Sequence, residues 1–140
     1  MKTRVRAVII EDGKVLLIKR TKPDVIYWVI PGGAVEENET DEQALIRECR
    51  EELGVDIVVK DLFFKMDSKK PETSGQKEHF YLCEIKGGKL GTGHGPEFTN
   101  SSIYIGKHEI EWTEIKGLKK IDLKPKDIRD LIYNKFLTNK

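Results

Sequence analysis

The first third of the chain alternates apolar runs with short polar segments. Val5–Ile10 and Val15–Ile18 are rich in β-branched residues, and the Asp12-Gly13 pair between them is a strong hairpin signal. The polar segment Thr21–Asp24, expected to be a loop, separates the second run from Tyr27–Ile30. The pattern therefore predicts that the chain opens with a hairpin and continues into a third short strand.

A helical pattern follows at about Thr40–Leu53. Thr40 and Gln43 have the spacing of a capping box, and Gly54 stands where a left-handed residue commonly ends a helix. At about 100° per residue the segment separates into an apolar face and a mainly acidic face. The apolar face holds Leu45, Ile46, Cys49 and Leu53, and the other holds Ala44, Glu48, Glu51 and Glu52. We expect the apolar face to pack against the rest of the protein.

The remaining periodicity predicts more strands and a terminal helix. Asp56–Met66, His79–Ile85 and Ile110–Ile115 have strand patterns, Asp67–Lys77 is a polar loop, and a helix starts near Lys124-Pro125-Lys126-Asp127. Strands on both sides of a central helix, with a second helix at the end, indicate an α/β fold in which a mixed sheet lies between helical layers.

Composition bounds the kind of protein and the kind of partner. The length of 140 residues and a hydrophobic content of 38% predict one domain over residues 1–140. A formal charge of +1 provides no field that would attract a long nucleic acid or an anionic membrane. No apolar run approaches the roughly 20 residues that span a bilayer, and the first residues lead directly into a strand pattern. We expect a cytoplasmic protein with a small-molecule partner; its oligomeric state stays open, a homodimer included.

Cysteines, histidines and aromatic residues form no evident site. Cys49 and Cys83 fall at apolar positions and are interpreted as buried thiols. The histidines stand in unrelated contexts and receive no role: His79, His94 and His108. Five aromatic residues are candidates for stacking on a base, although most of them are expected in the core: Tyr27, Trp28, Phe64, Phe80 and Phe98.

The acidic helix face is the chemically distinctive feature. Glu48 meets Glu52 at i,i+4 and Glu51 at i,i+3, where like charges destabilise an isolated helix by about 0.2–0.5 kcal/mol per pair. Arg47 can pair with Glu51, but nothing local neutralises all three carboxylates. A hard divalent cation, Mg²⁺ or alternatively Mn²⁺, would do so. The alternative is a solvated acidic face, which does not account for the Pro31-Gly32-Gly33 turn just ahead of the cluster.

The residues from Gly33 to Val55 resemble the Nudix box. Gly33 is followed after five residues by Glu39 and, after seven more, by the run RECREELGV at Arg47–Val55. Cys49 stands where the family usually has an aliphatic residue, and a buried free Cys behaves as a small hydrophobe. The resemblance implies a Nudix-type α/β/α sandwich with a mixed β-sheet.

The resemblance also implies a role for each box residue. The implied metal ligands for Mg²⁺ or Mn²⁺ are Glu48, Glu51, Glu52 and the carbonyl of Gly32. The implied catalytic residues are Glu48, Glu51 and Arg47, with Glu48 as the candidate base. Gly33 and Glu39 would lie next to these ligands without binding the metal themselves, and Glu39 would help to orient the cluster.

Glu97 is a further candidate ligand or base. In several Nudix subfamilies a glutamate from a loop after the box completes the metal shell or acts as base. Glu97 follows a glycine-rich segment and is stiffened on one side by Pro96, so it is the loop carboxylate best placed for this role. The alternative for Glu97 is a surface glutamate in a turn.

The implied activity is hydrolysis of a pyrophosphate bond in a nucleoside diphosphate linked to another moiety. The sequence leaves open whether that substrate is a nucleoside triphosphate, a nucleotide sugar, a dinucleoside polyphosphate or a capped RNA end. Pro71 has a spacing from the box that resembles a marker of ADP-ribose pyrophosphatases, which we interpret as coincidence. The alternative function is a Nudix-fold module that binds a nucleotide without cleaving it, whose expected signature is a degraded box; here the box is intact.

Overall fold

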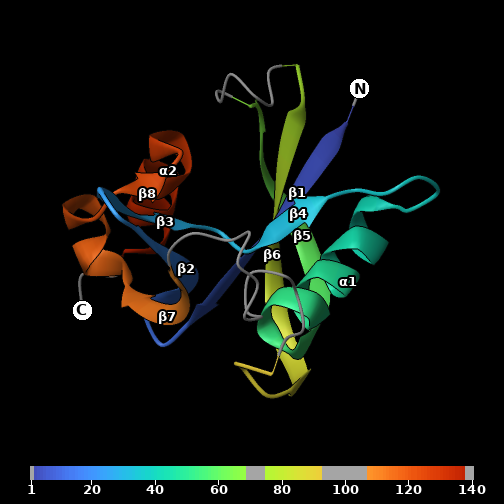
Figure 1. Ribbon diagram of the computed structural model, residues 1–140, viewed down its shortest axis with the longest axis horizontal. Coiled ribbons are helices and arrows are strands. Elements are labelled where there is room, and N and C mark those ends of the chain that lie inside the picture. The colour runs from blue at the N-terminus through green and yellow to red at the C-terminus, as the bar shows by residue number, and fades with distance from the viewer. Residues whose placement is uncertain (1, 69–74, 93–106, 138–140) are drawn as a thin grey trace.

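The computed structural model describes residues 2–68, 75–92 and 107–137 (Figure 1). Its elements are β1 (Thr3–Glu11), β2 (Lys14–Lys22), β3 (Val25–Val29), β4 (Gly32–Ala34), α1 (Asp41–Leu53), β5 (Val55–Asp67), β6 (Lys77–Gly88), β7 (Lys107–Glu114), a 3₁₀ helix (Ile115–Lys120), β8 (Leu123–Lys124) and α2 (Lys126–Phe136). None of the helices described is long and apolar enough to cross a membrane.

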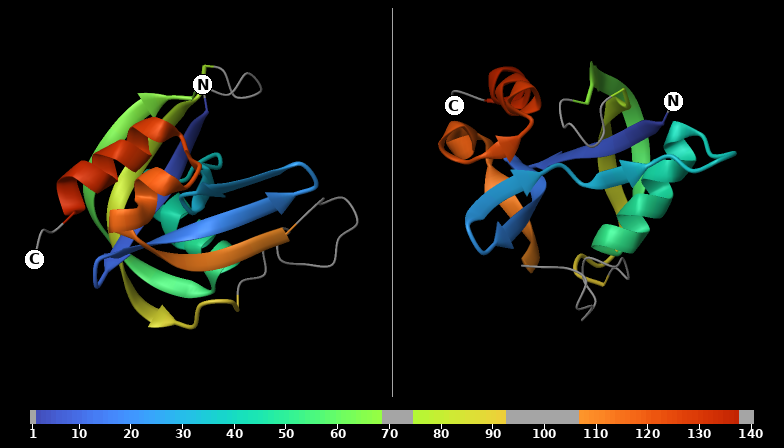
Figure 2. Two further views of the ribbon diagram at one scale, coloured as in Figure 1. Left: turned by 90° about the vertical axis from the view of Figure 1, so that its left-hand side faces the viewer. Right: turned by 45° about the horizontal axis from the view of Figure 1, so that its top comes forward.

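Strand β1 joins the two halves of the sheet. It pairs in parallel with β6 and antiparallel with β4, and its last residues pair antiparallel with β2. β5 lies beyond β6, whereas β7 and β3 both pair with β2, and β8 pairs with β3. The sheet is therefore mixed, and α1 and α2 lie on different sides of the strands (Figures 1 and 2). The predicted α/β/α sandwich with a mixed sheet is confirmed.

Two core clusters fill the space between the layers. Leu16 and Ile18 of β2 belong to the first cluster, and Val15 and Leu17 belong to the second. This division follows from the pleat, because successive side chains of a strand point to opposite faces. Residues of α1 cover the first cluster and residues of α2 cover the second. The carboxylates described below are carried by α1, on the side of the first cluster.

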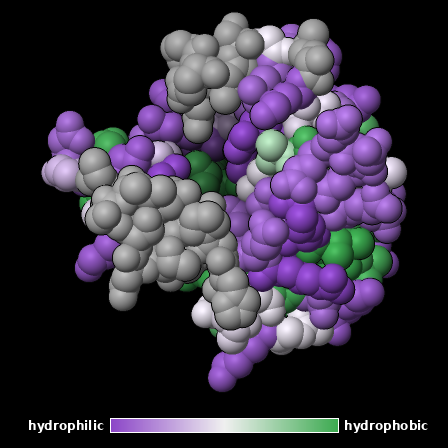
Figure 3. Space-filling view, turned by 45° about the vertical axis from the view of Figure 1, so that its right-hand side comes forward, coloured by the Kyte–Doolittle hydropathy of each residue, from purple (hydrophilic) through white to green (hydrophobic). Residues whose placement is uncertain are grey.

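Helix α1 has the boundaries that its local sequence predicts. The Thr40 side chain accepts from the backbone N–H of Gln43, and the Gln43 side chain accepts from the backbone N–H of Thr40, which completes the capping box. Gly54 ends the helix at φ +80°. The outer surface of this side of the molecule is largely hydrophilic (Figure 3). The assignment of residues to faces was wrong for Ala44, which is fully buried, and for Glu52, which is 7% exposed.

The two ends of α1 are fixed to the sheet by different means. At the first turn, one oxygen of Asp41 receives a hydrogen bond from the Tyr81 hydroxyl at 2.6 Å and lies 2.7 Å from Nδ1 of His79. Burial and this bond to Asp41 raise the pKa of Tyr81 to about 12. At the last turn, the backbone N–H of Gly91 donates to the carbonyl of Leu53. The carboxylates between these two anchors are therefore carried by a helix held at both ends.

The structure adds elements that the sequence pattern did not predict. The segment 21–24 is not simply a loop, because Thr21 and Lys22 continue β2 and pair with β3. β4 and β8 are short strands whose pairing partners are distant in sequence. The predicted strands near β5, β6 and β7 are present and are longer than predicted. Cys49 and Cys83 are buried free thiols, as expected.

Candidate active site

The predicted Pro31-Gly32-Gly33 turn is wrong for its two glycines, which belong to strand β4, and this Gly32-Gly33 segment, still called the turn below, is hydrogen-bonded directly to the acidic helix. The backbone N–H of Gly32 donates to Oε1 of Glu52 at 2.7 Å, and this bond is buried. Gly32 lies in β4 opposite Arg6 of β1, at φ +149°. A backbone amide that donates to a carboxylate makes a strong, charge-assisted hydrogen bond. The sequence pattern had placed Glu52 on the outer face of the helix. In the structure this residue connects the turn to α1.

Gly33 provides the space in which the Glu48 carboxylate lies. A Cβ built at Gly33 would overlap the carboxylate group of Glu48, so a side chain at this position would displace Glu48. The Glu48 side chain is 16% exposed, so most of it is shielded from solvent. The predicted supporting role of Gly33 has this geometric basis: absence of a side chain lets backbone and carboxylate come into contact.

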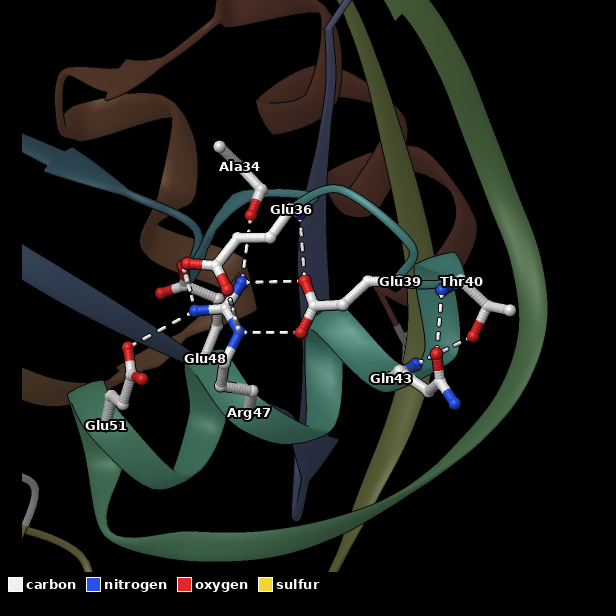
Figure 4. Close-up of polar contacts among 8 residues, drawn as sticks. All are labelled: Ala34, Glu36, Glu39, Thr40, Gln43, Arg47, Glu48 and Glu51. Atoms are coloured by element: carbon white, nitrogen blue, oxygen red, sulfur yellow. Dashed lines mark hydrogen bonds and ion pairs between the residues drawn. The ribbon is translucent and has the colours of Figure 1, made fainter.

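Arg47 binds several of the surrounding carboxylates at once (Figure 4). Its guanidinium makes two hydrogen bonds to Glu39, at 2.7 and 3.0 Å, one to Glu48 at 3.1 Å and one to Glu51 at 3.3 Å. A further bond to the carbonyl of Ala34, at 3.0 Å, attaches it to β4. The expectation that Arg47 pairs with Glu51 is met but was incomplete, because a planar guanidinium has five donors.

Glu39 holds Arg47 in place. Hydrogen bonding to Glu39 is the main cause that raises the pKa of Arg47 above its usual value. The same interaction, together with the backbone N–H of Glu36, lowers the pKa of Glu39. Because each partner stabilises the charged form of the other, the pair stays ionised at neutral pH. Glu39 and Glu48 thus bind the same Arg47 guanidinium, and the orienting role of Glu39 stays a prediction.

Replacing Arg47 with glutamine is expected to destabilise the protein by about 2 kcal/mol, because Glu39 and Glu48 lose a charged donor in a partly buried setting. Arg47→Lys should recover only part of the loss, since an ammonium cannot reproduce the forked contact with Glu39. Urea denaturation measures both effects. Arg50→Gln is the matched control: Arg50 is 64% exposed and pairs with Asp56, so its loss should cost less than about 0.5 kcal/mol. Equal losses for Arg47→Gln and Arg50→Gln would contradict the proposed role of Arg47.

A pocket of about 240 Å³ collects some of the predicted site residues and adds basic ones. From the predicted set it is lined by Gly32, Gly33, Glu48 and Glu52. Its other polar lining residues are Arg4, Arg6, Arg20 and His108, and we call this space the arginine pocket. Glu39, Arg47 and Glu51 do not line it. Glu97 and Pro71 lie outside the described residues.

The sequence analysis did not identify the three arginines of the arginine pocket. It considered His108, the fourth basic residue there, but gave it no role. Arg4 and Arg6 alternate along β1, and Arg20 lies opposite His108 where β2 pairs with β7. Burial and the neighbouring charge of Arg6 lower the pKa of Arg4. The Nε of Arg20 is buried and has no hydrogen-bond partner in the described part of the chain. The usable signal was the alternation of Arg4 and Arg6 with apolar residues along β1.

The oxygen atoms that line this pocket suit a hard divalent cation. The carboxylates of Glu48 and Glu52 lie beside the backbone of Gly32, and carboxylate and carbonyl oxygens are the ligands that Mg²⁺ prefers. The third predicted carboxylate, Glu51, is bound to Arg47 and is 47% exposed. Across residues 2–68, 75–92 and 107–137, no three acidic, histidine or cysteine side chains come together as a metal site. Glu48 and Glu52 thus line this pocket with Gly32 while Glu51 does not, and the assignment of all three glutamates as metal ligands stays a prediction.

Comparison with known proteins agrees with the box and the fold. A family profile described as NUDIX domain matches residues 1–132. The chain is 32% identical over 127 residues to CTP pyrophosphohydrolase of Escherichia coli, covering 89% of this chain and 84% of that protein. It is 34% identical over 125 residues to putative nudix hydrolase 1 of Caenorhabditis elegans, covering 87% of this chain but only 31% of that protein's length. The solution structure of the E. coli ORF135 protein superposes with a TM-score of 0.66 at 28% identity, covering 96% of this chain and 88% of that one.

Proposed function

We propose that this chain, which belongs to the NUDIX family, is a metal-dependent hydrolase that cleaves a pyrophosphate bond in a nucleoside diphosphate linked to a second group. The observation that carries the proposal is the arginine pocket, where the Glu48 and Glu52 carboxylates share one small space with Arg4, Arg6 and Arg20. A pyrophosphate is the kind of group that needs both kinds of residue, since its oxygens need cations and its hydrolysis needs an activated water.

The arginines bind and orient the phosphates. Arg6 donates to the carbonyl of Ile30 at 3.1 Å and to Glu78 at 3.3 Å, so its position is fixed before a substrate arrives. The buried Nε of Arg20 makes no hydrogen bond to another described residue, and a phosphate oxygen would supply an acceptor. Fixed donors of this kind stabilise charge that develops on the phosphate oxygens without reorganising during the reaction.

The carboxylates would hold the metal and accept a proton. Glu48, Glu52 and the carbonyl of Gly32 would bind Mg²⁺, with Mn²⁺ as the alternative ion, and the bound ion would neutralise phosphate charge and acidify water. Arg47 donates to Glu48 at 3.1 Å and the Glu48 carboxylate lies against Gly33, so the group proposed as base has a fixed position. The assignment of Glu51 as a third ligand stays a prediction, as does that of Glu97.

A hydrolysis screen tests the proposal. Purified protein would be incubated with nucleoside triphosphates, nucleotide sugars and dinucleoside polyphosphates in Mg²⁺ or Mn²⁺, and the products separated by chromatography. We expect a nucleoside monophosphate to be released from at least one substrate, in a reaction that a chelator stops. The E. coli relative is named for CTP, which makes CTP the first substrate to assay. Nucleotide binding measured by calorimetry without turnover on any substrate would instead favour the alternative of a binding module.

Magnesium is expected to raise the melting temperature, because an ion bound only by the folded state stabilises it. At about five times its Kd, Mg²⁺ would contribute about 1 kcal/mol, which corresponds to a rise of about 4 °C for a domain of this size. Scanning calorimetry with and without Mg²⁺ measures the shift independently of activity. The control is the Glu48→Gln, Glu52→Gln double variant, in which the shift should disappear. An equal shift in the variant would place the ion elsewhere.

A further inference from the structure

A second hollow adjoins the arginine pocket. It has a volume of about 420 Å³ and is lined by Leu90, Gly91, His108, Glu109, Ile110 and Trp112. His108 lines both spaces, so the two are neighbours on one side of the protein. We call the second space the β7 hollow. Its walls differ from those of the arginine pocket, because among the described residues they contain an indole ring and two aliphatic side chains and no arginine or lysine.

The strand register shows how the two spaces are connected. Along β7, His108, Ile110 and Trp112 point to the same face, because they are two residues apart. Their partners on β2 are Arg20, Ile18 and Leu16, respectively. One continuous face therefore changes from basic at the Arg20–His108 pair to apolar at the Leu16–Trp112 pair, over a length of about 13 Å along the strand.

Trp112 is available for a ligand, whereas the other tryptophan is not. The indole N–H of Trp28 donates to Glu111 at 3.0 Å, and Lys19 lies 5.6 Å from its ring centroid. Trp28 also packs against the second core cluster, on the opposite side of the sheet from the arginine pocket. Trp112 is half-buried and has no hydrogen bond or ring contact with any other residue in the described ranges. Trp112 packs against the first core cluster and also lines the hollow.

The aromatic candidates drawn from the sequence do not line this hollow. Phe80 is fully buried in the second core cluster, and Phe64 packs against it with ring centroids 6.0 Å apart. Tyr27 is 8% exposed and is surrounded by basic side chains, among them Lys124 at 4.9 Å from its ring centroid. Phe98 lies outside the described residues. Trp112, which was not among the candidates, is the aromatic residue that borders the hollow.

We propose that the β7 hollow binds the heterocyclic base of the substrate, with the base against Trp112 and Ile110 and the phosphates in the arginine pocket. This inference rests on the proposed function, because it takes the arginine pocket to be the phosphate site. A base is planar and uncharged, so it suits an apolar wall with an indole, while its exocyclic groups can meet the polar side chain of His108. The substrate is then a nucleotide whose base contributes to binding rather than to bond cleavage.

Kinetics of two matched tryptophan variants test the assignment. Trp112→Leu is expected to raise KM for a nucleotide substrate about tenfold and to change kcat by less than about twofold, because base stacking on an aromatic ring contributes to binding. Trp28→Phe should leave both constants within about twofold of the original protein. Circular dichroism establishes that both variants are folded. An unchanged KM for Trp112→Leu would overturn the proposal.

The chain contains two tryptophans, so single-tryptophan variants report on each site. In Trp28→Phe the remaining emission comes from Trp112, and in Trp112→Phe it comes from Trp28. We expect the α,β-methylene analogue of CTP or ATP to quench the emission of Trp28→Phe in a saturable way and to leave that of Trp112→Phe unchanged. Methylenediphosphonate, which has no base, should quench neither. Saturable binding by calorimetry without quenching of Trp112 would overturn the proposal.

These measurements separate the failure of the inference from the failure of the proposed function. The fluorescence titration uses analogues that cannot be cleaved between the α and β phosphates, the bond whose hydrolysis releases a nucleoside monophosphate, so it reports base binding whether or not the protein is an enzyme. If the original protein hydrolyses a nucleotide but Trp112 is not quenched, the base lies elsewhere and the proposed function stands. If Trp112 is quenched but no substrate is hydrolysed, the hollow binds a base and the proposed hydrolase activity is wrong.

Discussion

Glu48→Gln and Glu52→Gln are each expected to lower turnover by at least about a hundredfold while the protein remains folded. Both changes keep the size of the side chain and remove its negative charge, which the proposed metal requires. In Glu52→Gln the amide oxygen can still accept the hydrogen bond from Gly32. The loss should therefore appear in kcat rather than in stability. Steady-state kinetics and thermal denaturation of the same preparations measure the two quantities separately.

The matched control for these variants is Glu42→Gln. Glu42 lies in the first turn of α1 and is exposed, and it does not line the arginine pocket. It shares the helix and the chemical change with Glu48→Gln but not the site, so its turnover should stay within about twofold of the original. Activity close to the original in both Glu48→Gln and Glu52→Gln would remove these carboxylates from the proposed mechanism.

Gly32→Ala is expected to cost at least about 3 kcal/mol of folding free energy. Gly32 has φ +149°, which L residues rarely adopt, and an added Cβ would collide with the carbonyl oxygen of Val5 and lie 2.9 Å from Cα of Arg6. Both obstacles are backbone atoms of β1, which cannot move away without breaking the pairing with β4. Urea denaturation should show a lower midpoint for this variant, or no folded state at all.

Gly33→Ala is expected to behave differently although it changes the next residue. The added Cβ would meet the end of the Glu48 side chain, which can rotate away, so the protein should fold with a smaller loss of stability. Turnover should fall because the Glu48 carboxylate leaves its position. Gly117→Ala is the control for both variants, because nothing lies within 4 Å of a Cβ at that position. A Gly32→Ala variant as stable as Gly117→Ala would contradict the account of the turn.

The local sequence was sufficient to predict helix α1 and the order of the box residues. The capping box of Thr40 and Gln43 and the C-terminal Gly54 are interactions between residues at most five positions apart, and the structure contains them where the pattern places them. The opening hairpin follows from Asp12-Gly13 for the same reason. Spacing along the chain also put Glu39, Arg47 and Glu48 in order, but their contacts with one another are known only from the structure.

Only the tertiary structure decided which residues share a pocket. Arg6 and Arg20 lie on different strands, and His108 reaches them through the pairing of β7 with β2, about ninety residues further along the chain. No periodicity can reveal such a neighbour, because a strand pattern is the same whichever strand it pairs with.

The burial of Glu52 was decided in the same way. A charged residue on a helix is expected in solvent, and the prediction failed because β4 brings the backbone N–H of Gly32 to within 2.7 Å of its carboxylate. Trp112 was overlooked because the sequence shows an aromatic residue in a strand but not the hollow beside it. The sequence by itself determined helix α1, the glutamates that it carries and the family to which the chain belongs. The pairing of distant strands decided which basic and aromatic side chains lie near those glutamates.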